Sequence, residues 1–127
     1  KMLLFIEPVI LVGCIVAYFI APWIIPFVFG EEYVVAPILF RGMLLMVTIA
    51  LPEYLMGYPA LSAFGKFKEP NIAVILAGSF HVIGFITLYA VQAITLMNIV
   101  YLTFLTELIV TLVRGLFLYK AYREIKI

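Results

Sequence analysis

Charged residues are scarce in this sequence, at 12% of the chain, whereas soluble domains average about 25%. Hydrophobic residues make up 67% of the chain, and its mean hydropathy is +1.26. A chain of 127 residues has too little polar surface to enclose so many apolar side chains in water. The scarcity of charge therefore excludes a soluble globular domain and favours a protein embedded in lipid.

Other absences exclude several kinds of chemistry. The single cysteine, Cys14, lies within an apolar run, which is typical of a buried structural thiol and not of a disulfide or a metal ligand. The sequence has no nucleophile elbow, no Gly-rich phosphate loop, no cluster of residues at metal-ligand spacing and no basic nucleic-acid patch. We therefore expect no enzymatic activity, no cofactor, no metal site and no nucleic-acid partner.

Length and hydropathy predict an all-α integral membrane fold with four transmembrane helices. A span needs about 20 to 25 residues, so a chain of 127 residues accommodates four with short connections. We expect the spans at about residues 2–27, 36–64, 71–89 and 97–119. Because the chain begins at Lys1 and is apolar from there on, we expect residues 1–127 to be a piece of a longer protein.

Polar residues and helix breakers mark most of the connections. Residues 29–33 and 65–70 form polar connections, and Pro52, Gly57 and Pro59 interrupt the second span. The break between the third and fourth spans falls between about residues 89 and 98, where neither Gly nor Pro marks it. Its place is therefore predicted only loosely.

The distribution of charge predicts the topology. Basic residues gather in one connection and in the C-terminal tail: Lys66, Lys68, Lys120, Arg123 and Lys126. Such residues favour the cytoplasmic side of a membrane, whereas residues 30–33 are acidic and contain no Lys or Arg. We expect both ends of the segment to be cytoplasmic, with Lys66 and Lys68 also in contact with anionic membrane lipid.

Two stretches resemble a known transporter family. Residues 25–33 read Ile-Pro-Phe-Val-Phe-Gly-Glu-Glu-Tyr, and residues 61–66 read Leu-Ser-Ala-Phe-Gly-Lys. In this order, spacing and topology the chain resembles the polysaccharide biosynthesis C-terminal domain of O-antigen and capsule flippases. These belong to the multidrug/oligosaccharidyl-lipid/polysaccharide exporter superfamily. The resemblance covers essentially the whole chain and implies the last four helices of a twelve-helix exporter.

The resemblance implies a function and a location. It implies two helical bundles in the bacterial inner membrane that move a lipid-diphosphate-linked glycan outward by alternating access, with the remaining helices of the transporter as partners. Two alternatives stay open. One is a cation-coupled multidrug exporter of the same superfamily, and the other is a membrane assembly subunit without transport activity.

Ionisable residues near the middle of a span are costly and often mark a pathway through the membrane. Glu53, His81 and Glu107 lie near the middle of the second, third and fourth spans, so they could meet at a similar depth. His81 shares its helix face with small residues, which favours helix packing over a functional role. Glu53 follows Pro52, where a bent helix leaves backbone carbonyls unpaired. It is either an ion or proton site or a hydrogen-bonding residue between helices.

Glu107 lies on a polar stripe of the fourth span. Thr103, Thr111 and Arg114 are at positions i−4, i+4 and i+7 and so share its face. This pattern fits a cavity wall in which Glu107 either binds a proton or cation or acts as a counter-charge that positions Arg114. It fits equally well an internal pair of Glu107 with Arg114.

Arg41 lies about a turn and a half inside the outer end of the second span. Its planar fork of donors matches phosphate geometry, so one interpretation is contact with a diphosphate head group. The other interpretation is an interface anchor whose charged end reaches the outer lipid head groups. The substrate or ion pathway candidates are therefore Arg41, Glu53, His81, Glu107 and Arg114.

Overall fold

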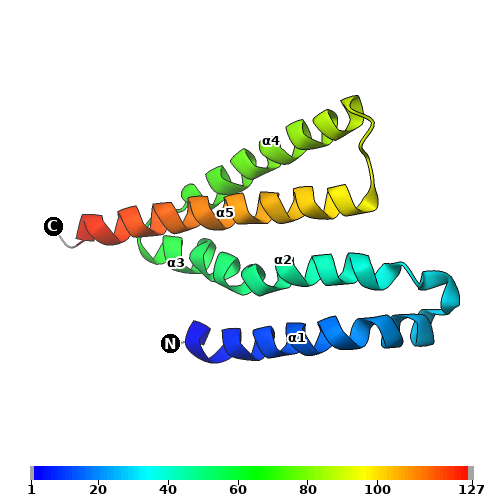
Figure 1. The fold of residues 1–127 in the computed structure, drawn as a ribbon. Coiled ribbons are helices and arrows are strands. Elements are labelled where there is room, and N and C mark those ends of the chain that lie inside the picture. The colour runs from blue at the N-terminus through cyan, green and yellow to red at the C-terminus, as the bar shows by residue number, and fades with distance from the viewer. Residues whose placement is uncertain (1, 126–127) are drawn as a thin grey trace.

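The computed structural model describes residues 2–125, which are helical apart from short connections and contain no strand. Figure 1 shows the arrangement of its helices. Their bounds are α1 Met2–Phe29, the short 3₁₀ helix η1 Glu31–Tyr33, α2 Ala36–Met56, α3 Tyr58–Ala63, α4 Glu69–Ala90 and α5 Leu96–Ile125. The prediction of an all-helical chain is confirmed.

Four stretches are long and apolar enough to cross a membrane, as predicted. They are Phe5–Phe29, Ala36–Ala63, Glu69–Ala90 and Leu96–Ile125. Large apolar side chains such as Phe27, Ile75 and Leu116 are mostly exposed on their surfaces. Because exposed apolar surface on this scale is stable only against lipid or further helices, the chain is a multi-pass membrane protein.

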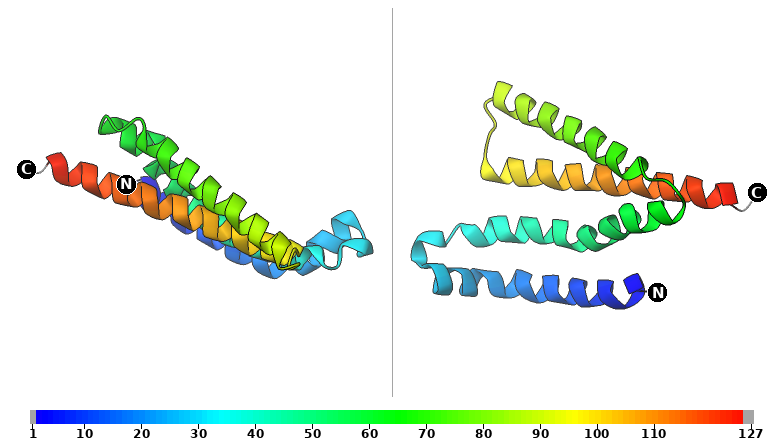
Figure 2. Two further views of the ribbon diagram at one scale, coloured as in Figure 1. Left: turned by 90° about the horizontal axis from the view of Figure 1, so that it is seen from above. Right: turned by 180° about the vertical axis from the view of Figure 1, so that it is seen from behind.

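The four long helices form an open row. The principal contacts join α1 to α2, α2 to α5, and α5 to α4. Figures 1 and 2 accordingly show α1 and α4 at the two edges, with α2 and α5 between them. The second and fourth spans are thus neighbours, although the third lies between them in the sequence.

Both ends of the described chain lie at the same end of the row (Figure 1). The turn between α3 and α4 lies at this end too, whereas the α1–α2 and α4–α5 connections lie at the other (Figures 1 and 2). This is the arrangement that four crossings require.

α1 continues through three prolines. Pro8, Pro22 and Pro26 all lie inside the helix, which ends at Phe29 and not near residue 27. Gly30 then reverses the chain with a φ of 103°, which favours glycine, and its N–H donates to the Pro26 carbonyl at 2.8 Å. Glycine, more than proline, sets the end of this span.

The interruption of the second span lies at Gly57. α2 passes through Pro52 and ends at Met56, and α3 begins at Tyr58. The Gly57 N–H donates to the carbonyls of Glu53 and Tyr54 at 3.1 and 3.2 Å. The Gly57 N–H therefore stays paired at the break, as a membrane interior requires.

The connection between α4 and α5 spans residues 91–95, within the predicted range. Gln92 adopts a left-handed φ of 54°, a conformation usually left to glycine. Thr95 and Asn98 then close the turn: the Thr95 hydroxyl oxygen accepts from the Asn98 N–H at 3.1 Å, and the Asn98 amide donates to the Ala93 carbonyl at 2.7 Å. Side-chain hydrogen bonds thus support a turn that has no glycine or proline.

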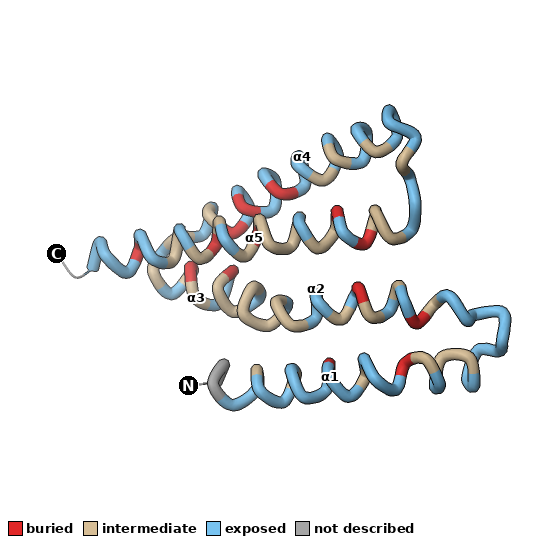
Figure 3. Tube along the Cα trace, viewed as in Figure 1, coloured by how far each residue is buried: buried red, intermediate tan, exposed pale blue. Residues whose placement is uncertain are grey.

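The most completely buried packing lies between α4 and α5, where Figure 3 shows buried stretches facing one another. Ala73 and Ala77 are almost fully buried and pack near Val110. At Gly84, a Cβ atom would come within 2.5 Å of Leu102. The small residues predicted to form a packing seam do so, because they let the two backbones approach closely.

Candidate functional site

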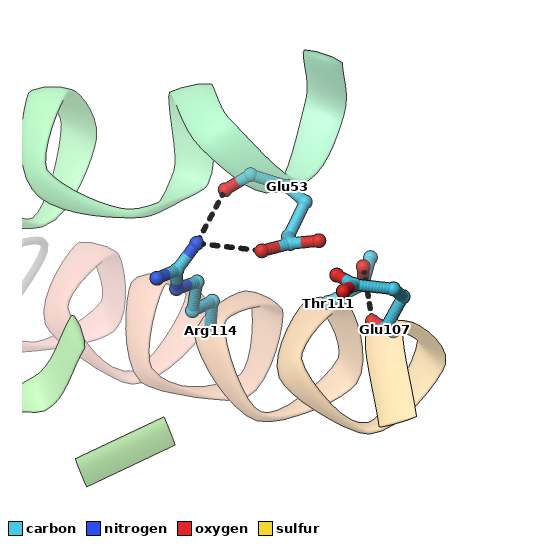
Figure 4. Close-up of polar contacts among 4 residues, drawn as sticks. All are labelled: Glu53, Glu107, Thr111 and Arg114. Atoms are coloured by element: carbon cyan, nitrogen blue, oxygen red, sulfur yellow. Dashed lines mark hydrogen bonds and ion pairs between the residues drawn. The ribbon is translucent and has the colours of Figure 1, made fainter. Parts of the chain in front are cut away.

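An ion pair joins α2 to α5 in the middle of the row. Arg114 Nη1 lies 2.9 Å from Glu53 Oε1, and the same nitrogen donates to the Glu53 backbone carbonyl at 3.3 Å (Figure 4). The two side chains are only 11% and 15% exposed. A charge-assisted bond in such surroundings is strong, because water does not compete for it.

The break in the second span makes room for this pair. A Cβ atom at Gly57 would lie 3.1 Å from both Cζ and Nη1 of Arg114. Any side chain at position 57 would therefore press on the guanidinium group. Gly57 ends α2 one turn after Glu53 and also forms one wall of the arginine site.

Glu107 adds a second carboxyl group to the site. Its side chain is turned toward the Glu53 carboxyl group in Figure 4, so the site holds two neighbouring carboxyl groups. Two carboxylates have acceptors only and repel one another, so a proton shared between neighbouring carboxyl groups favours their approach. We name Glu53, Glu107 and Arg114 the carboxyl–arginine cluster.

The cluster contains two carboxyl groups, which can each be negative, and one positive guanidinium group. With both carboxyl groups ionised its net charge is −1, and with one shared proton it is neutral. No group of three or more His, Cys, Asp or Glu side chains within residues 2–125 is placed to hold a metal ion. The arrangement therefore suits binding of a proton better than binding of a divalent metal.

The partner of Arg114 differs from one of the two sequence interpretations, which paired it with Glu107. Seven residues along a helix correspond to about 10 Å, so Arg114 and Glu107 lie two turns apart. Reaching across to α2 is shorter, because Gly57 leaves the space open. Thr111 does not bridge the two residues, since its hydroxyl donates to the Glu107 backbone carbonyl at 2.9 Å.

His81 lies at the level of the cluster but on another side of α5. Its Nδ1 is 2.8 Å from the hydroxyl oxygen of Thr106, the residue before Glu107. The Thr106 hydroxyl donates to the Leu102 carbonyl at 2.8 Å, so its oxygen accepts from His81. His81 therefore ties α4 to α5, and its side chain is not in the cluster.

Arg41 lies apart from the cluster, against α1. Its Nε donates to the Tyr18 backbone carbonyl at 2.9 Å. Its guanidinium carbon lies 4.4 Å from the centre of the Tyr18 ring, a cation–π contact. The structure thus separates the five candidates into three places: the cluster, the α4–α5 seam and the α1–α2 interface.

Glu7 is an ionisable residue that sequence reasoning missed. It is the only charged residue of the Phe5–Phe29 span, and its Oε2 is enclosed without a hydrogen-bond partner in the described part of the chain. The bond between Arg41 and Tyr18 fixes the level of α1 against α2, which run antiparallel. Eleven residues before Tyr18 on α1 is Glu7, and eleven residues after Arg41 on α2 is Pro52, so these two residues lie at the same level. A lone carboxyl group in an apolar run was the signal that could have found it.

A separate ion pair fastens the end of the row that carries the termini. Lys66 Nζ lies 2.8 Å from Glu124 Oε2, and both side chains are partly exposed. The hydrogen bond to Glu124 and its negative charge raise the pKa of Lys66 above the usual lysine value. Lys66 therefore stays protonated and joins the α3–α4 turn to the end of α5.

Comparisons with known proteins add no relative. No protein-family model, no curated protein and no solved structure matches the chain. The geometry of the carboxyl–arginine cluster and the pattern of the sequence are therefore the grounds for a functional proposal.

Proposed function

We propose that this chain is the C-terminal part of an exporter that moves a lipid-linked oligosaccharide across the bacterial inner membrane by alternating access. One observation carries the proposal, namely the carboxyl–arginine cluster between two membrane-spanning helices. An ionisable side chain near the middle of a span costs about 2.5 to 3.5 kcal/mol on insertion scales. Such a cost usually accompanies a function that needs charge within the membrane.

The composition of the cluster favours transport over a purely structural role. A structural ion pair would be complete with Arg114 and Glu53 alone. Glu107 makes the charge of the site depend on one proton, and a change of charge there alters how strongly α2 and α5 attract one another. The cluster thus supplies a link between proton binding and helix arrangement, which proton-driven alternating access would use.

The cargo and the orientation rest on the sequence. A lipid-diphosphate-linked glycan follows from the resemblance of residues 25–33 and 61–66 to polysaccharide flippases. The cytoplasmic placement of both ends follows from the basic residues that flank the spans. The open faces of the row are the surfaces on which the other helices of the exporter would pack.

The test uses the full-length protein in cells that lack their own exporter. We expect Glu53→Gln and Glu107→Gln to lower surface glycan per transporter molecule, while the amount of protein in the membrane stays nearly unchanged. Glu31→Gln is the matched control, because Glu31 lies in the exposed connection after α1. Normal surface glycan in both cluster variants would show that these carboxyl groups are structural.

A further inference from the structure

An apolar groove runs along the half of the row nearer the α4–α5 connection, where α1, α2 and the first turns of α5 meet. Its volume is about 480 Å³, within the range of about 300 to 1,000 Å³ that small-ligand pockets occupy. Its lining includes Cys14, Tyr18, Ile38, Leu45, Thr48 and Tyr101. No acidic side chain contributes to the lining, and its single charged residue is Arg41.

Arg41 lies at the mouth of this groove. A Cβ atom on its neighbour Gly42 would contact Val100 and Met97, which belong to the first turns of α5. Arg41 is therefore level with the beginning of α5, at the end of the row that carries the α4–α5 connection (Figure 1). Arg41 thus lies about a turn and a half inside the end of its span, close enough for its long side chain to reach the head groups of one leaflet, whereas the carboxyl–arginine cluster lies deeper.

Contacts within the protein hold the Arg41 guanidinium group in place but leave its terminal nitrogens free to donate hydrogen bonds. Tyr18 fixes it through the bond to Nε and through the ring contact, and no hydrogen bond to the terminal nitrogens occurs within residues 2–125. A planar fork with free terminal donors matches the oxygens of a phosphate group.

The groove leads from Arg41 toward the middle of the membrane. Thr48 lies seven residues beyond Arg41 on α2, and Leu11 lies seven residues before Tyr18 on α1. At 1.5 Å per residue, the groove extends about 10 Å inward from the guanidinium group. Apart from the Thr48 hydroxyl, which donates to its own helix at the Leu45 carbonyl, the deep lining is apolar.

We propose that this groove is a binding site for one phospholipid, with its phosphate on the free donors of Arg41 and one acyl chain along α1 and α2. One cation at the mouth of an otherwise uncharged groove balances one phosphodiester. A second positive charge, which a diphosphate would favour, is missing from the lining. The site is distinct from the carboxyl–arginine cluster and does not depend on the proposed export activity.

Photocrosslinking of the full-length protein in lipid nanodiscs tests this site. The nanodiscs contain phosphatidylethanolamine and phosphatidylglycerol, with a trace of phosphatidylglycerol that carries a diazirine in one acyl chain. We expect crosslinks to concentrate on the groove, within residues 11–19 and 38–48. Loss of a charge-assisted hydrogen bond lowers affinity roughly tenfold, so Arg41→Ala should remove most of these crosslinks.

A second variant tests the groove without touching Arg41. Leu45 is 49% exposed and lines the groove, so Leu45→Trp should fill the space and also suppress the crosslinks. Leu112→Trp is the matched control, because Leu112 is 65% exposed on α5 and lies away from the groove. Arg123→Ala controls for loss of a positive charge elsewhere.

Two results would overturn the proposal. Crosslinks spread evenly over the exposed apolar faces, with no response to Arg41→Ala or Leu45→Trp, would mean that lipid only surrounds the protein. Absence of lipid crosslinks in the groove, with diazirine adducts elsewhere on the same protein, would mean that another helix or a second copy fills it.

Discussion

Arg114 contacts Glu53, whose negative charge it compensates, through a single nitrogen atom. Nη1 contacts both the carboxylate and the backbone carbonyl of Glu53, whereas Nε is enclosed without a hydrogen-bond partner in residues 2–125. The two carboxyl groups of the cluster therefore depend on one guanidinium. Removing a partner from such a site leaves an uncompensated charge, which costs more than the intact pair contributes.

Substitution of Arg114 should expose this dependence. We expect Arg114→Ala to lower the free energy of unfolding by about 3 kcal/mol, because Glu53 and Glu107 then lack a counter-charge. Arg114→Lys should keep most of the stability, since it preserves the charge although it loses the fork. Thermal unfolding of the purified protein in detergent measures both effects.

A double variant separates charge from packing in this experiment. Adding Glu53→Gln to Arg114→Ala removes one of the uncompensated carboxylates and should restore part of the lost stability. Equal stability of the double and single variants would contradict the assignment of the loss to charge.

Gly57 is the second residue on which the cluster depends. We expect Gly57→Ala to destabilise the protein by about 1 to 2 kcal/mol, because the new methyl group must displace the Arg114 guanidinium. The measurement is again thermal unfolding in detergent.

Gly115→Ala on α5 is the matched control for Gly57→Ala. Its Cβ atom would meet only the Met56 sulfur, at an ordinary 3.8 Å. Helix propensity then favours alanine, and the variant should be neutral or slightly stabilised. If both variants behave alike, the guanidinium moves aside freely and Gly57 is not required for the site.

At the scale of helices, hydropathy predicts well where the membrane spans lie in the sequence. It predicts poorly which side chains pair with one another between the spans. The spans follow from long apolar runs, which depend only on neighbouring residues in the sequence. The pairing of Arg114 with Glu53 joins residues 61 positions apart, and the packing order α1, α2, α5, α4 decides it. Sequence reasoning brought the two carboxyl groups to one depth, but it could not tell that Arg114 would face α2.

The α4–α5 turn gives a prediction at this scale. Gln92 occupies a left-handed conformation that costs a residue with a side chain about 1 to 2 kcal/mol. Glycine avoids this strain but loses more entropy on folding, so we expect Gln92→Gly to stabilise the protein by about 0.5 kcal/mol. Chemical or thermal unfolding in detergent should resolve this as a small rise in the midpoint.

The neighbouring position provides the control for Gln92→Gly. Val91 has a φ of −89°, which any residue adopts, so Val91→Gly brings only the entropic cost and should destabilise. Stabilisation by both substitutions would mean that the turn is limited by something other than the Gln92 backbone.

For the whole molecule, the open row of helices leaves large apolar surfaces exposed at its two edges. α1 and α4 each have one principal neighbour among the long helices, and their outer faces carry large exposed apolar side chains. These residues predict a membrane location from composition alone. They do not predict which helices lie side by side, because a helix face against lipid and a helix face against another membrane helix both carry apolar side chains.

The topology of the row can be tested directly. We expect tags after Ile127 and within residues 66–69 to be cytoplasmic, and a tag between Gly30 and Val34 to be external. The physical reason is the excess of Lys and Arg at one end of the row. Protease protection or thiol labelling at each tag gives the measurement, and an external C-terminal tag with a cytoplasmic Lys66 turn would contradict four crossings.

The neighbouring placement of α2 and α5 has a consequence for biosynthesis. Glu53 leaves the ribosome 61 residues before Arg114. At about 5 to 20 residues per second, its counter-charge is synthesised roughly 3 to 12 seconds later. During that interval the nascent α2 carries a carboxyl group with no arginine to meet it, so the helix must either bind a proton or wait beside the insertion machinery. A ribosome stalled between α4 and Arg114 would hold the chain in that state, and there α2 should be most accessible to insertion chaperones and membrane proteases.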